Sequence, residues 1–162
     1  MKALFAGSFD PFTIGHRSIV ERGLQIFDSV VIAIGHNENK RGEWTEQERI
    51  KAIKTLFEDN PRVEVTGYNG LTADFAKQTG ASVLLRGARG VIDFEYERNL
   101  ADANREIGGI ETVILISEPE YSYISSSMVR ELVHNGHDAT RYIAGDFHIS
   151  KADRHNDTIN ME

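Results

Sequence analysis

The chain has 162 residues, 40% hydrophobic and 27% charged, with no cysteine and a formal net charge of −7, which is typical of a single globular domain spanning residues 1–162. The acidic charge argues against a nucleic-acid backbone as the main ligand. The lack of cysteine excludes disulfides, and no apolar run approaches the ~20 residues of a membrane span. Without a basic-then-apolar signal pattern, we expect a cytoplasmic protein that binds neither nucleic acid nor membrane.

Apolar segments with strand and helix patterns alternate from the amino terminus onward. The run Ala3–Ala6 predicts a first buried strand, and apolar residues then recur at helical spacing over Ile19–Phe27. Val30–Ile34 is rich in β-branched residues and predicts a strand that is covered on both sides. Thr45 and Glu48 have the spacing of a capping box and predict the start of the next helix.

The second half of the chain continues the alternation. Three more strands are predicted, at Val63–Thr66, Val83–Arg86 and Val113–Ile116. Three more helices are predicted, at Leu71–Gln78, from about Asp93 to Ile107, and from Ser125–Ser127 to Val133. We therefore predict an α/β fold, a doubly wound (Rossmann-like) five-stranded parallel sheet of order 3-2-1-4-5 with helices on both faces. Residues 144–162, which include the polar stretch Lys151–Glu162, are expected to be a surface or frayed segment.

Four loops are predicted to meet at one edge of this sheet. Ligands of doubly wound sheets bind outside the carboxyl ends of the strands, where the strand order reverses. Here that point lies between strands one and four, so the turns Gly7–His16 and Arg86–Arg89 become neighbours. Lys40 and Ser125–Ser127 follow strands two and five at the same edge. Glycines, hydroxyls, cations and a helix N-terminus together favour a phosphate site.

Each of these features also has a purely structural interpretation. His16 alone can be a solvated histidine at a helix start, and Arg86–Arg89 can be an exposed turn. The three serines can have a purely structural role, with one of them serving as the N-cap of the following helix. Glu97 is expected either to be half-exposed at the edge of a helix stripe or to accept hydrogen bonds from a ligand, and we favour the ligand. We expect no metal site among the remaining histidines of the last third, since they lack cysteine or a close carboxylate pair: His134, His137, His148 and His155.

Four segments at or near this edge resemble known sequences. The segment Gly7–His16, Gly-Ser-Phe-Asp-Pro-Phe-Thr-Ile-Gly-His, resembles the T/HxGH signature of the nucleotidyltransferase superfamily. Arg86-Gly-Ala-Arg89, Asp93-Phe-Glu-Tyr-Glu97 and Ile124-Ser-Ser-Ser127 narrow the resemblance to the phosphopantetheine adenylyltransferase family. It extends from Lys2 to about Ile143. It implies transfer of the adenylyl group of ATP to 4′-phosphopantetheine in coenzyme A biosynthesis, giving dephospho-coenzyme A and pyrophosphate, by a homohexamer whose Mg²⁺ arrives with ATP.

The resemblance also implies roles for individual residues. His16 would be catalytic, contacting the ATP phosphates and stabilising the transition state, with Lys40, Arg86 and Arg89 as further counter-charges. Phosphopantetheine would be bound by Ser8, Lys40, Thr72 and Arg86. ATP would be bound by Ser8, Phe9, His16, Gly87, Ala88, Arg89, Glu97, Tyr121, Ser122, Tyr123, Ile124, Ser125, Ser126 and Ser127.

Some positions depart from the commonest family pattern. Ser8 stands where threonine is usual, Thr72 where an apolar residue is frequent, and Tyr121 where tryptophan is common. Two other functions stay open on the sequence alone. One is a nucleotidyltransferase with another acceptor, such as nicotinate mononucleotide or glycerol phosphate. The other is a nucleotide-binding sensor without catalytic activity, although binding alone does not need His16 and the complete set of cations.

Overall fold

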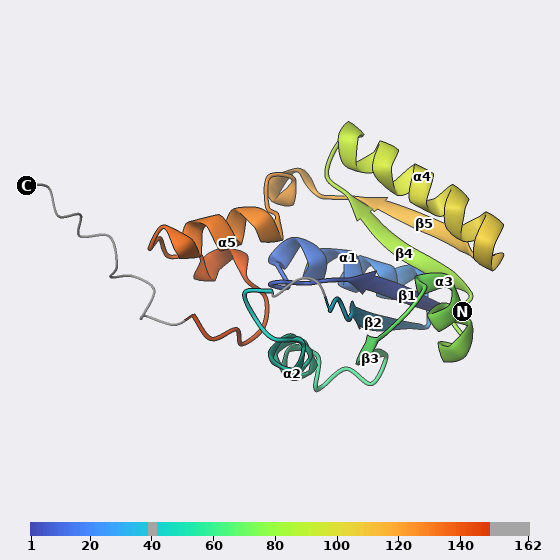
Figure 1. Cartoon of the computed structure of the whole chain (residues 1–162), viewed down its shortest axis with the longest axis horizontal. Helices are drawn as coiled ribbons and strands as arrows, with labels where there is room; N and C mark the ends of the chain where they lie inside the picture. Colours follow the sequence, from blue (N-terminus) through green and yellow to red (C-terminus); the bar gives the residue numbers. More distant parts are fainter. Residues whose placement is uncertain (39–41, 150–162) are drawn as a thin grey trace, which may run out of the picture.

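Five parallel strands form one sheet in the computed structural model, which describes residues 1–38 and 42–149 (Figure 1). The order β3-β2-β1-β4-β5 confirms the predicted 3-2-1-4-5 arrangement. Each strand contains the predicted run and is two residues longer. The strands are β1 (Lys2–Gly7), β2 (Ser29–Gly35), β3 (Val63–Tyr68), β4 (Val83–Ala88) and β5 (Glu111–Ile116).

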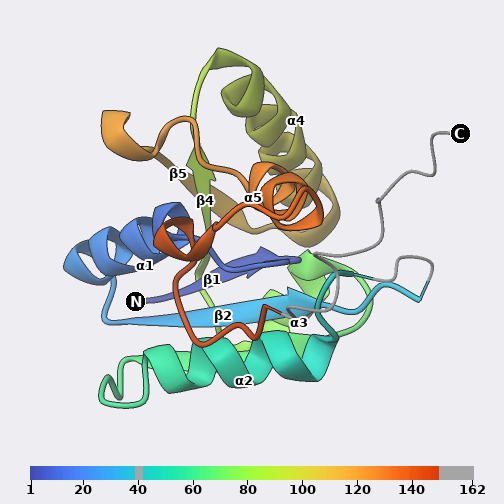
Figure 2. The same cartoon turned by 90° about the vertical axis from the view of Figure 1, so that its left-hand side faces the viewer.

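The helices lie on both faces of the sheet, as predicted. They are α1 (Ile14–Ile26), α2 (Glu46–Leu56), α3 (Thr72–Thr79), α4 (Val91–Gly108) and α5 (Ser126–His134), with short 3₁₀ turns at Pro119–Tyr121 and Thr140–Tyr142. Buried residues of α1 and α2 pack on one face of the central strands, whereas those of α3 pack on the other. Figure 2 shows α4 alongside β4 and β5, and α2 alongside β2, near opposite ends of the sheet.

Local signals set the helix boundaries. Thr45 accepts the Glu48 N–H and Glu48 accepts the Thr45 N–H, so the predicted capping box is confirmed. Gly80 ends α3 in the left-handed conformation, with φ 73°, a geometry that glycine adopts without strain. Helix α4 begins at Val91, two residues before the predicted Asp93, because the helix is capped by backbone geometry at Gly90 rather than by a side chain. None of the helices in the described ranges is long and apolar enough to cross a membrane.

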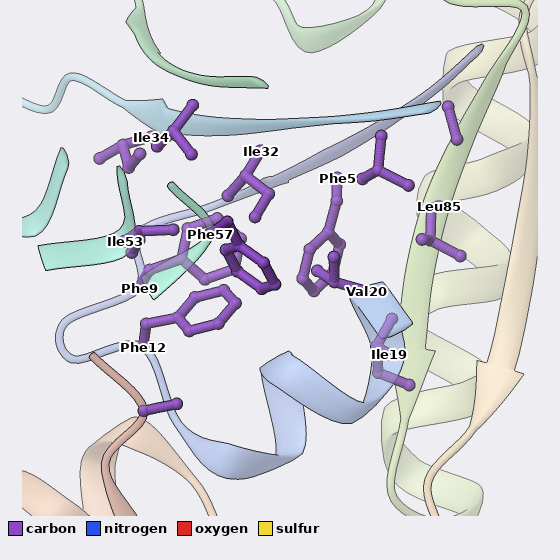
Figure 3. Close-up of a cluster of buried hydrophobic side chains, with 14 of the residues drawn as sticks. Phe5, Phe9, Phe12, Ile19, Val20, Ile32, Ile34, Ile53, Phe57 and Leu85 are labelled. Atoms are coloured by element: carbon purple, nitrogen blue, oxygen red, sulfur yellow. The ribbon is translucent and has the colours of Figure 1, made fainter. Parts of the chain in front are cut away.

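Aromatic rings anchor the loop after β1 in the core (Figure 3). Phe9, at φ 48°, is only 3% exposed. Its ring centroid lies 5.1 Å from that of Phe5 and 5.2 Å from that of Phe12. Phe12 in turn contacts Phe57, just after α2, at 6.2 Å. Burial of four large side chains fixes the course of this loop, since each is worth roughly 1.5–3 kcal/mol.

Residues 144–149 return to the body of the domain, whereas the sequence predicts a surface or frayed segment. Ala144 and Phe147 are buried in the main core, and the Phe147 ring packs edge-on against Trp44 at 5.5 Å. The Trp44 indole N–H donates to the carbonyl of His148 at 2.9 Å. Three apolar residues interspersed with polar ones, Ala144, Phe147 and Ile149, give no clear periodic signal, so burial here depends on the tertiary fold. The predicted tail Lys151–Glu162 lies outside the described residues.

Candidate active site

A cavity of about 400 Å³ opens at the carboxyl edge of the sheet, where β1 and β4 are neighbours. This is the point of reversed strand order at which the sequence predicts the site. The turn after β1, the start of α1, the turn from β4 into α4, and the segment leading into α5 all contribute to its walls. Three predicted loops therefore meet there. The fourth predicted contribution, Lys40, lies outside the described residues.

The cavity brings together most of the predicted site residues. Twelve of them line it: Ser8, Phe9, His16, Arg86, Gly87, Arg89, Glu97, Tyr121, Ile124, Ser125, Ser126 and Ser127. Four do not: Thr72, Ala88, Ser122 and Tyr123. Ala88 is fully buried, and the hydroxyl of Thr72 is 2.8 Å from that of Tyr68, outside the cavity wall. Sequence reasoning missed five polar lining residues: Thr13, Asp93, Tyr96, Ser117 and Arg130.

Helix capping fixes the orientation of the His16 imidazole. The N–H of Thr13 donates to Nδ1 of His16 at 2.9 Å, while the His16 N–H donates to the Thr13 hydroxyl at 3.3 Å. Because Nδ1 accepts a hydrogen bond, the proton of the neutral ring lies on Nε2. No residue in the described ranges hydrogen-bonds Nε2. His16 also lines the cavity, so its Nε2–H is available to donate to a ligand.

His16 is uncharged at neutral pH and is therefore not one of the counter-charges, contrary to the expectation from sequence. Burial, with the positive charges of Arg86 and Arg89, lowers the pKa of His16 to about 3. Its ring packs 5.1 Å from that of Phe9 and 5.3 Å from that of Phe12. These apolar neighbours disfavour the charged form. His16 therefore acts as a neutral hydrogen-bond donor, and the arginines supply the positive charge.

Of the two alternatives predicted for Glu97, the half-exposed one is wrong. Glu97 is buried, with 6% exposed, and it pairs with Arg86 rather than lying half-exposed. Arg86 Nε donates to Oε2 at 2.6 Å, and Nη2 donates to Oε1 at 2.7 Å. Arg86 Nη1 also donates to the carbonyl of Ala6 on β1. The guanidinium is thus held at the cavity wall from two sides.

Asp93 holds Arg89 in a similar way. Arg89 Nε is 2.7 Å from Asp93 Oδ2, and the backbone N–H of Arg89 donates to the same oxygen at 3.1 Å. Hydrogen bonding from the Arg89 side chain lowers the pKa of Asp93, so this carboxyl is ionised at neutral pH. The Asp-Phe-Glu-Tyr-Glu motif therefore orients both arginines of the preceding turn: Asp93 pairs with Arg89 and Glu97 with Arg86.

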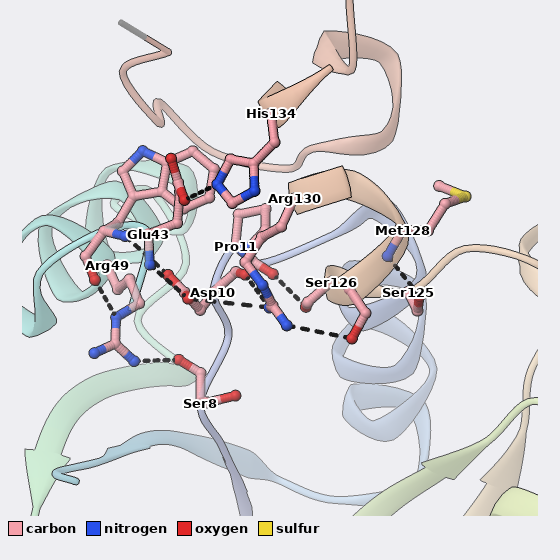
Figure 4. A network of polar contacts seen from close by, with 12 residues as sticks. Ser8, Asp10, Pro11, Glu43, Arg49, Ser125, Ser126, Met128, Arg130 and His134 are labelled. Carbon is pink, nitrogen blue, oxygen red and sulfur yellow. Dashed lines mark hydrogen bonds and ion pairs between the residues drawn. The ribbon is translucent and has the colours of Figure 1, made fainter. Parts of the chain in front are cut away.

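Side chains from two other elements hold the carbonyl groups of the turn after β1 (Figure 4). Arg49 of α2 donates to the carbonyl of Ser8 at 2.5 Å. Arg130 of α5 donates to the carbonyl of Asp10 at 2.6 Å, and the Ser126 hydroxyl donates to that of Pro11 at 2.8 Å. These bonds satisfy carbonyls that have no partner in the sheet. The turn is therefore fixed relative to α2 and α5.

The Asp10 carboxylate joins the turn after β1 to the loop after β2. Its Oδ2 accepts the N–H of Glu43 and its Oδ1 accepts the N–H of Trp44, both at 2.9 Å. Asp10 is 7% exposed, so its carboxylate has little contact with water. These two bonds, together with Arg130, whose Nη1 lies 4.0 Å from Oδ2, stabilise the carboxylate in place of water. His134 of α5 contacts the same loop through Glu43, with Nε2 at 2.5 Å from the carboxylate.

The serines of the Ile124–Ser127 motif each have a distinct partner. Ser125 is the N-cap of α5 and accepts the N–H of Met128 at 3.0 Å. Ser126 donates to Pro11, as described above, and the Ser127 hydroxyl accepts from Arg130 Nη2 at 3.2 Å. Ser125 thus serves as the predicted cap, and all three serines contribute to the cavity wall.

Two of the other histidines, His36 and His134, each pair with one carboxylate. His134 pairs with a single carboxylate, that of Glu43, from a distant part of the sequence. His36 pairs with Glu46 at 2.6 Å. Within residues 1–38 and 42–149, no three His, Asp or Glu side chains are placed to hold a metal ion.

Comparison with known proteins identifies close relatives. The Cytidylyltransferase-like family model matches residues 4–132. A phosphopantetheine adenylyltransferase of Phocaeicola vulgatus is 51% identical over 142 residues, which cover 88% of this chain and 94% of that protein. One of Porphyromonas gingivalis is also 51% identical, over 145 residues that cover 90% of this chain and 95% of that protein.

Solved structures with similar folds are more distant in sequence. A bifunctional NMN adenylyltransferase/ADP ribose pyrophosphatase of Francisella tularensis, complexed with AMP and manganese ion, has a TM-score of 0.67 and 14% identity. The match covers 90% of this chain and 44% of that one. The NadR protein in complex with NR has a TM-score of 0.60 and 16% identity, covering 88% and 42%. These likenesses support the fold, while the sequence relatives show that the chain belongs to the phosphopantetheine adenylyltransferase family.

Proposed function

We propose that this cavity transfers the adenylyl group of ATP to 4′-phosphopantetheine, giving dephospho-coenzyme A and pyrophosphate. The observation that carries the proposal is the convergence of His16, Arg86 and Arg89 on one cavity in a chain of this family. Two arginines and a neutral donor at a helix N-terminus suit a reaction between two anionic substrates.

The reaction is an in-line displacement at phosphorus. An oxygen of the acceptor phosphate forms a bond to the α-phosphorus of ATP, the bond from that phosphorus to the bridging oxygen breaks, and pyrophosphate leaves with the electron pair. The acceptor is already an anion, so no general base is required. Catalysis depends on holding the two substrates in line and stabilising the charge that develops. The Nε2–H of His16 supplies one such hydrogen bond.

The two substrates would occupy different parts of the cavity edge. The acceptor phosphate would lie against Arg86 and Ser8. Lys40 and Thr72, which is at the start of α3, would contact the rest of phosphopantetheine. ATP would contact the backbone of Phe9, the turn 87–89 and the segment 121–127. Arg89, which is oriented by Asp93, would contribute positive charge to the ATP phosphates.

We also propose that Mg²⁺ enters with ATP. The two carboxylates that line the cavity, Asp93 and Glu97, are each engaged by an arginine. This set does not fit a metal held by the protein, because Mg²⁺ prefers oxygen ligands with free lone pairs and near-octahedral geometry. The phosphate oxygens of ATP would then be the ligands, and no step of the reaction is assigned to the metal here.

We propose that the protein is a homo-oligomer, and family resemblance implies a hexamer. An apolar surface on α4 supports this proposal. Val91 and Ile92 are 83% and 85% exposed, and Tyr96 is 64% exposed. Apolar side chains exposed together on one helix often form subunit interfaces. Sedimentation velocity is expected to give the mass of a hexamer, and a monomer at micromolar concentration would contradict this proposal. The absence of cysteine is consistent with action in the cytoplasm, which cell fractionation would test.

Pyrophosphate release with a panel of substrates tests the proposed reaction. We expect release with ATP and 4′-phosphopantetheine, and little with CTP, nicotinate mononucleotide or glycerol phosphate. A preference for another acceptor would assign a different nucleotidyl transfer. Nucleotide binding without release in any combination would identify a sensor.

A further inference from the structure

The segment between β5 and the serine motif is attached to helix α1 by two side-chain hydrogen bonds. Ile116 ends β5, and its carbonyl accepts from Arg22 of α1 at 2.8 Å. Two residues later, Oε2 of Glu118 accepts the hydroxyl of Ser18, also on α1, at 3.1 Å. Ser18 and Glu118 are 100 positions apart in the sequence, so the tertiary fold alone brings them together.

Tyr121 follows this contact directly. Its N–H donates to the carbonyl of Glu118 at 2.9 Å, within the 3₁₀ turn Pro119–Tyr121. A Cβ atom at Gly15 would lie 3.8 Å from the Cβ of Tyr121, so Tyr121 lies over the first turn of α1, which also contains His16. Tyr121 and His16 both line the cavity. The position of Tyr121 relative to His16 therefore depends on how the 3₁₀ turn is held against α1.

Helix α1 is a firm support for this contact. Ser18 is 8% exposed, and its neighbours Ile19 and Val20 are buried in the main core against the sheet. A buried hydroxyl requires a hydrogen-bond partner, and here the Glu118 carboxylate is the acceptor. Hydrogen bonds to an ionised acceptor are stronger than those between neutral groups. Because the core fixes α1, the Ser18 hydroxyl restrains Glu118 and the turn that follows it.

The location of the pair points to an indirect role. In the described part of the chain neither Ser18 nor Glu118 lines the cavity, whereas Ser117 and Tyr121, on either side of Glu118, do. A carboxylate close to a triphosphate site repels the ligand through its charge, so the charge of Glu118 gives ATP no advantage. Any gain for ATP binding therefore comes from the position of the turn.

We infer that Ser18 and Glu118 are positioning residues, which hold Tyr121 at the nucleotide side of the cavity and so place ATP relative to His16. This inference rests on the proposed function, in which ATP contacts the segment 121–127. It deepens that function by assigning the Ser18–Glu118 pair to ATP binding rather than to acceptor binding. A turn that is already ordered costs the ligand less conformational entropy on binding.

Calorimetry with ATP alone and with 4′-phosphopantetheine alone tests the inference in Glu118→Ala. We expect the dissociation constant for ATP to rise about three- to tenfold, because one charge-assisted hydrogen bond is lost while the Arg22 bond remains. The dissociation constant for phosphopantetheine is expected to change by less than about twofold. Glu118→Gln keeps an oxygen that can accept the Ser18 hydroxyl, so it is expected to retain ATP affinity within about twofold of wild type.

Glu120→Ala is the matched control. Glu120 is an exposed glutamate on the same 3₁₀ turn, so its removal makes the same change in charge and leaves the Ser18–Glu118 bond intact. Neither affinity is expected to change by more than about twofold.

Combined substitutions show whether the pair acts through Tyr121. Ser18→Ala removes the donor and is expected to weaken ATP binding to the same extent as Glu118→Ala. The double variant is expected to lose no more than about twofold beyond either single variant, because both remove the same bond. In a Tyr121→Ala background, adding Glu118→Ala is expected to change ATP affinity by less than about twofold.

Four results would overturn the inference. Tighter ATP binding in Glu118→Ala would make the charge decisive, and not the position of the turn. Equal losses for ATP and phosphopantetheine would show general damage to the fold. Unchanged ATP affinity in Glu118→Ala would show that the segment is held without this pair. A tenfold loss from Glu118→Ala that persists in Tyr121→Ala would show that Tyr121 does not transmit the effect.

Circular dichroism confirms that each variant is folded, and Ser18→Ala carries the same expectation for the two affinities if Glu118→Ala does not fold. Pyrophosphate release by the wild type is measured separately. Its absence refutes the proposed function, whereas ATP affinity is measured without turnover and still decides the role of Ser18 and Glu118.

Discussion

The lowered pKa of His16 predicts an acid-sensitive contribution to stability. In the unfolded chain His16 has the ordinary histidine pKa of 6.5, and in the folded protein its pKa is about 3. The unfolded state therefore binds a proton below pH 6.5 that the folded state does not bind, and stability falls with pH over the window from about 6.5 to 3. Between pH 7 and pH 4 this linkage costs about 3 kcal/mol.

The substitution His16→Gln isolates this contribution. Glutamine at the third helical position can still accept the N–H of the capping residue, so the Thr13 cap is retained while the titrating group is lost. Urea denaturation at pH 7 and pH 4 is expected to show that wild type loses about 3 kcal/mol more than the variant. Titrations of the carboxyl groups are common to both proteins and cancel in the difference.

The urea experiment has a control variant and an outcome that would contradict the prediction. His137→Gln, which removes an exposed histidine, controls for the loss of an imidazole elsewhere and is expected to lose stability in parallel with wild type. Equal losses in wild type and His16→Gln, within about 0.5 kcal/mol, would show that burial does not lower the pKa of His16. The role of His16 as a neutral donor would then be wrong.

Three other predictions concern single side chains around the cavity. His16→Ala is expected to remain folded and to lose roughly 10²–10³-fold in kcat, the cost of one transition-state donor; wild-type turnover would remove His16 from the mechanism. Arg86→Ala is expected to weaken phosphopantetheine more than ATP in calorimetry, and equal losses would contradict its assignment to the acceptor. Asp10→Ala leaves two backbone N–H groups without their acceptor and is expected to lower the free energy of unfolding by about 2–4 kcal/mol. An unchanged urea midpoint would argue against that structural role.

The sheet and the position of the site follow from local patterns in the sequence. Val30–Ile34 predicts a strand that is covered on both sides, and all five of these residues are buried in β2. The strand order then brings the turns after β1 and β4 together. Periodicity and turn residues contain this information because they depend on neighbours a few positions away.

The partners of the site residues depend on contacts that have no local pattern. Glu97 lies on a helix face beside Phe94 and Ala101, and nothing in that spacing indicates that its partner is Arg86 on the preceding strand. Arg49 and Arg130 donate to backbone carbonyls of the turn after β1. Every residue has a backbone carbonyl, so the residue types do not indicate which one accepts.

A signal for the His16 orientation was present in the sequence but is unusual. Thr13 and His16 have capping-box spacing, but the usual residue at the second position is Glu or Gln. Here the imidazole Nδ1 replaces the carboxylate oxygen. Reading Thr-x-x-His as a cap would have predicted both the helix start and the Nε2–H tautomer.

The fate of the ATP phosphates tests the proposed reaction most directly. With ATP labelled at the α-phosphate and 4′-phosphopantetheine as acceptor, the label is expected in dephospho-coenzyme A; with ATP labelled at the γ-phosphate, it is expected in pyrophosphate. Both transfers are expected to fall together in His16→Ala. Label in inorganic phosphate, or an α-label that remains in AMP with phosphopantetheine unchanged, would contradict adenylyl transfer to this acceptor.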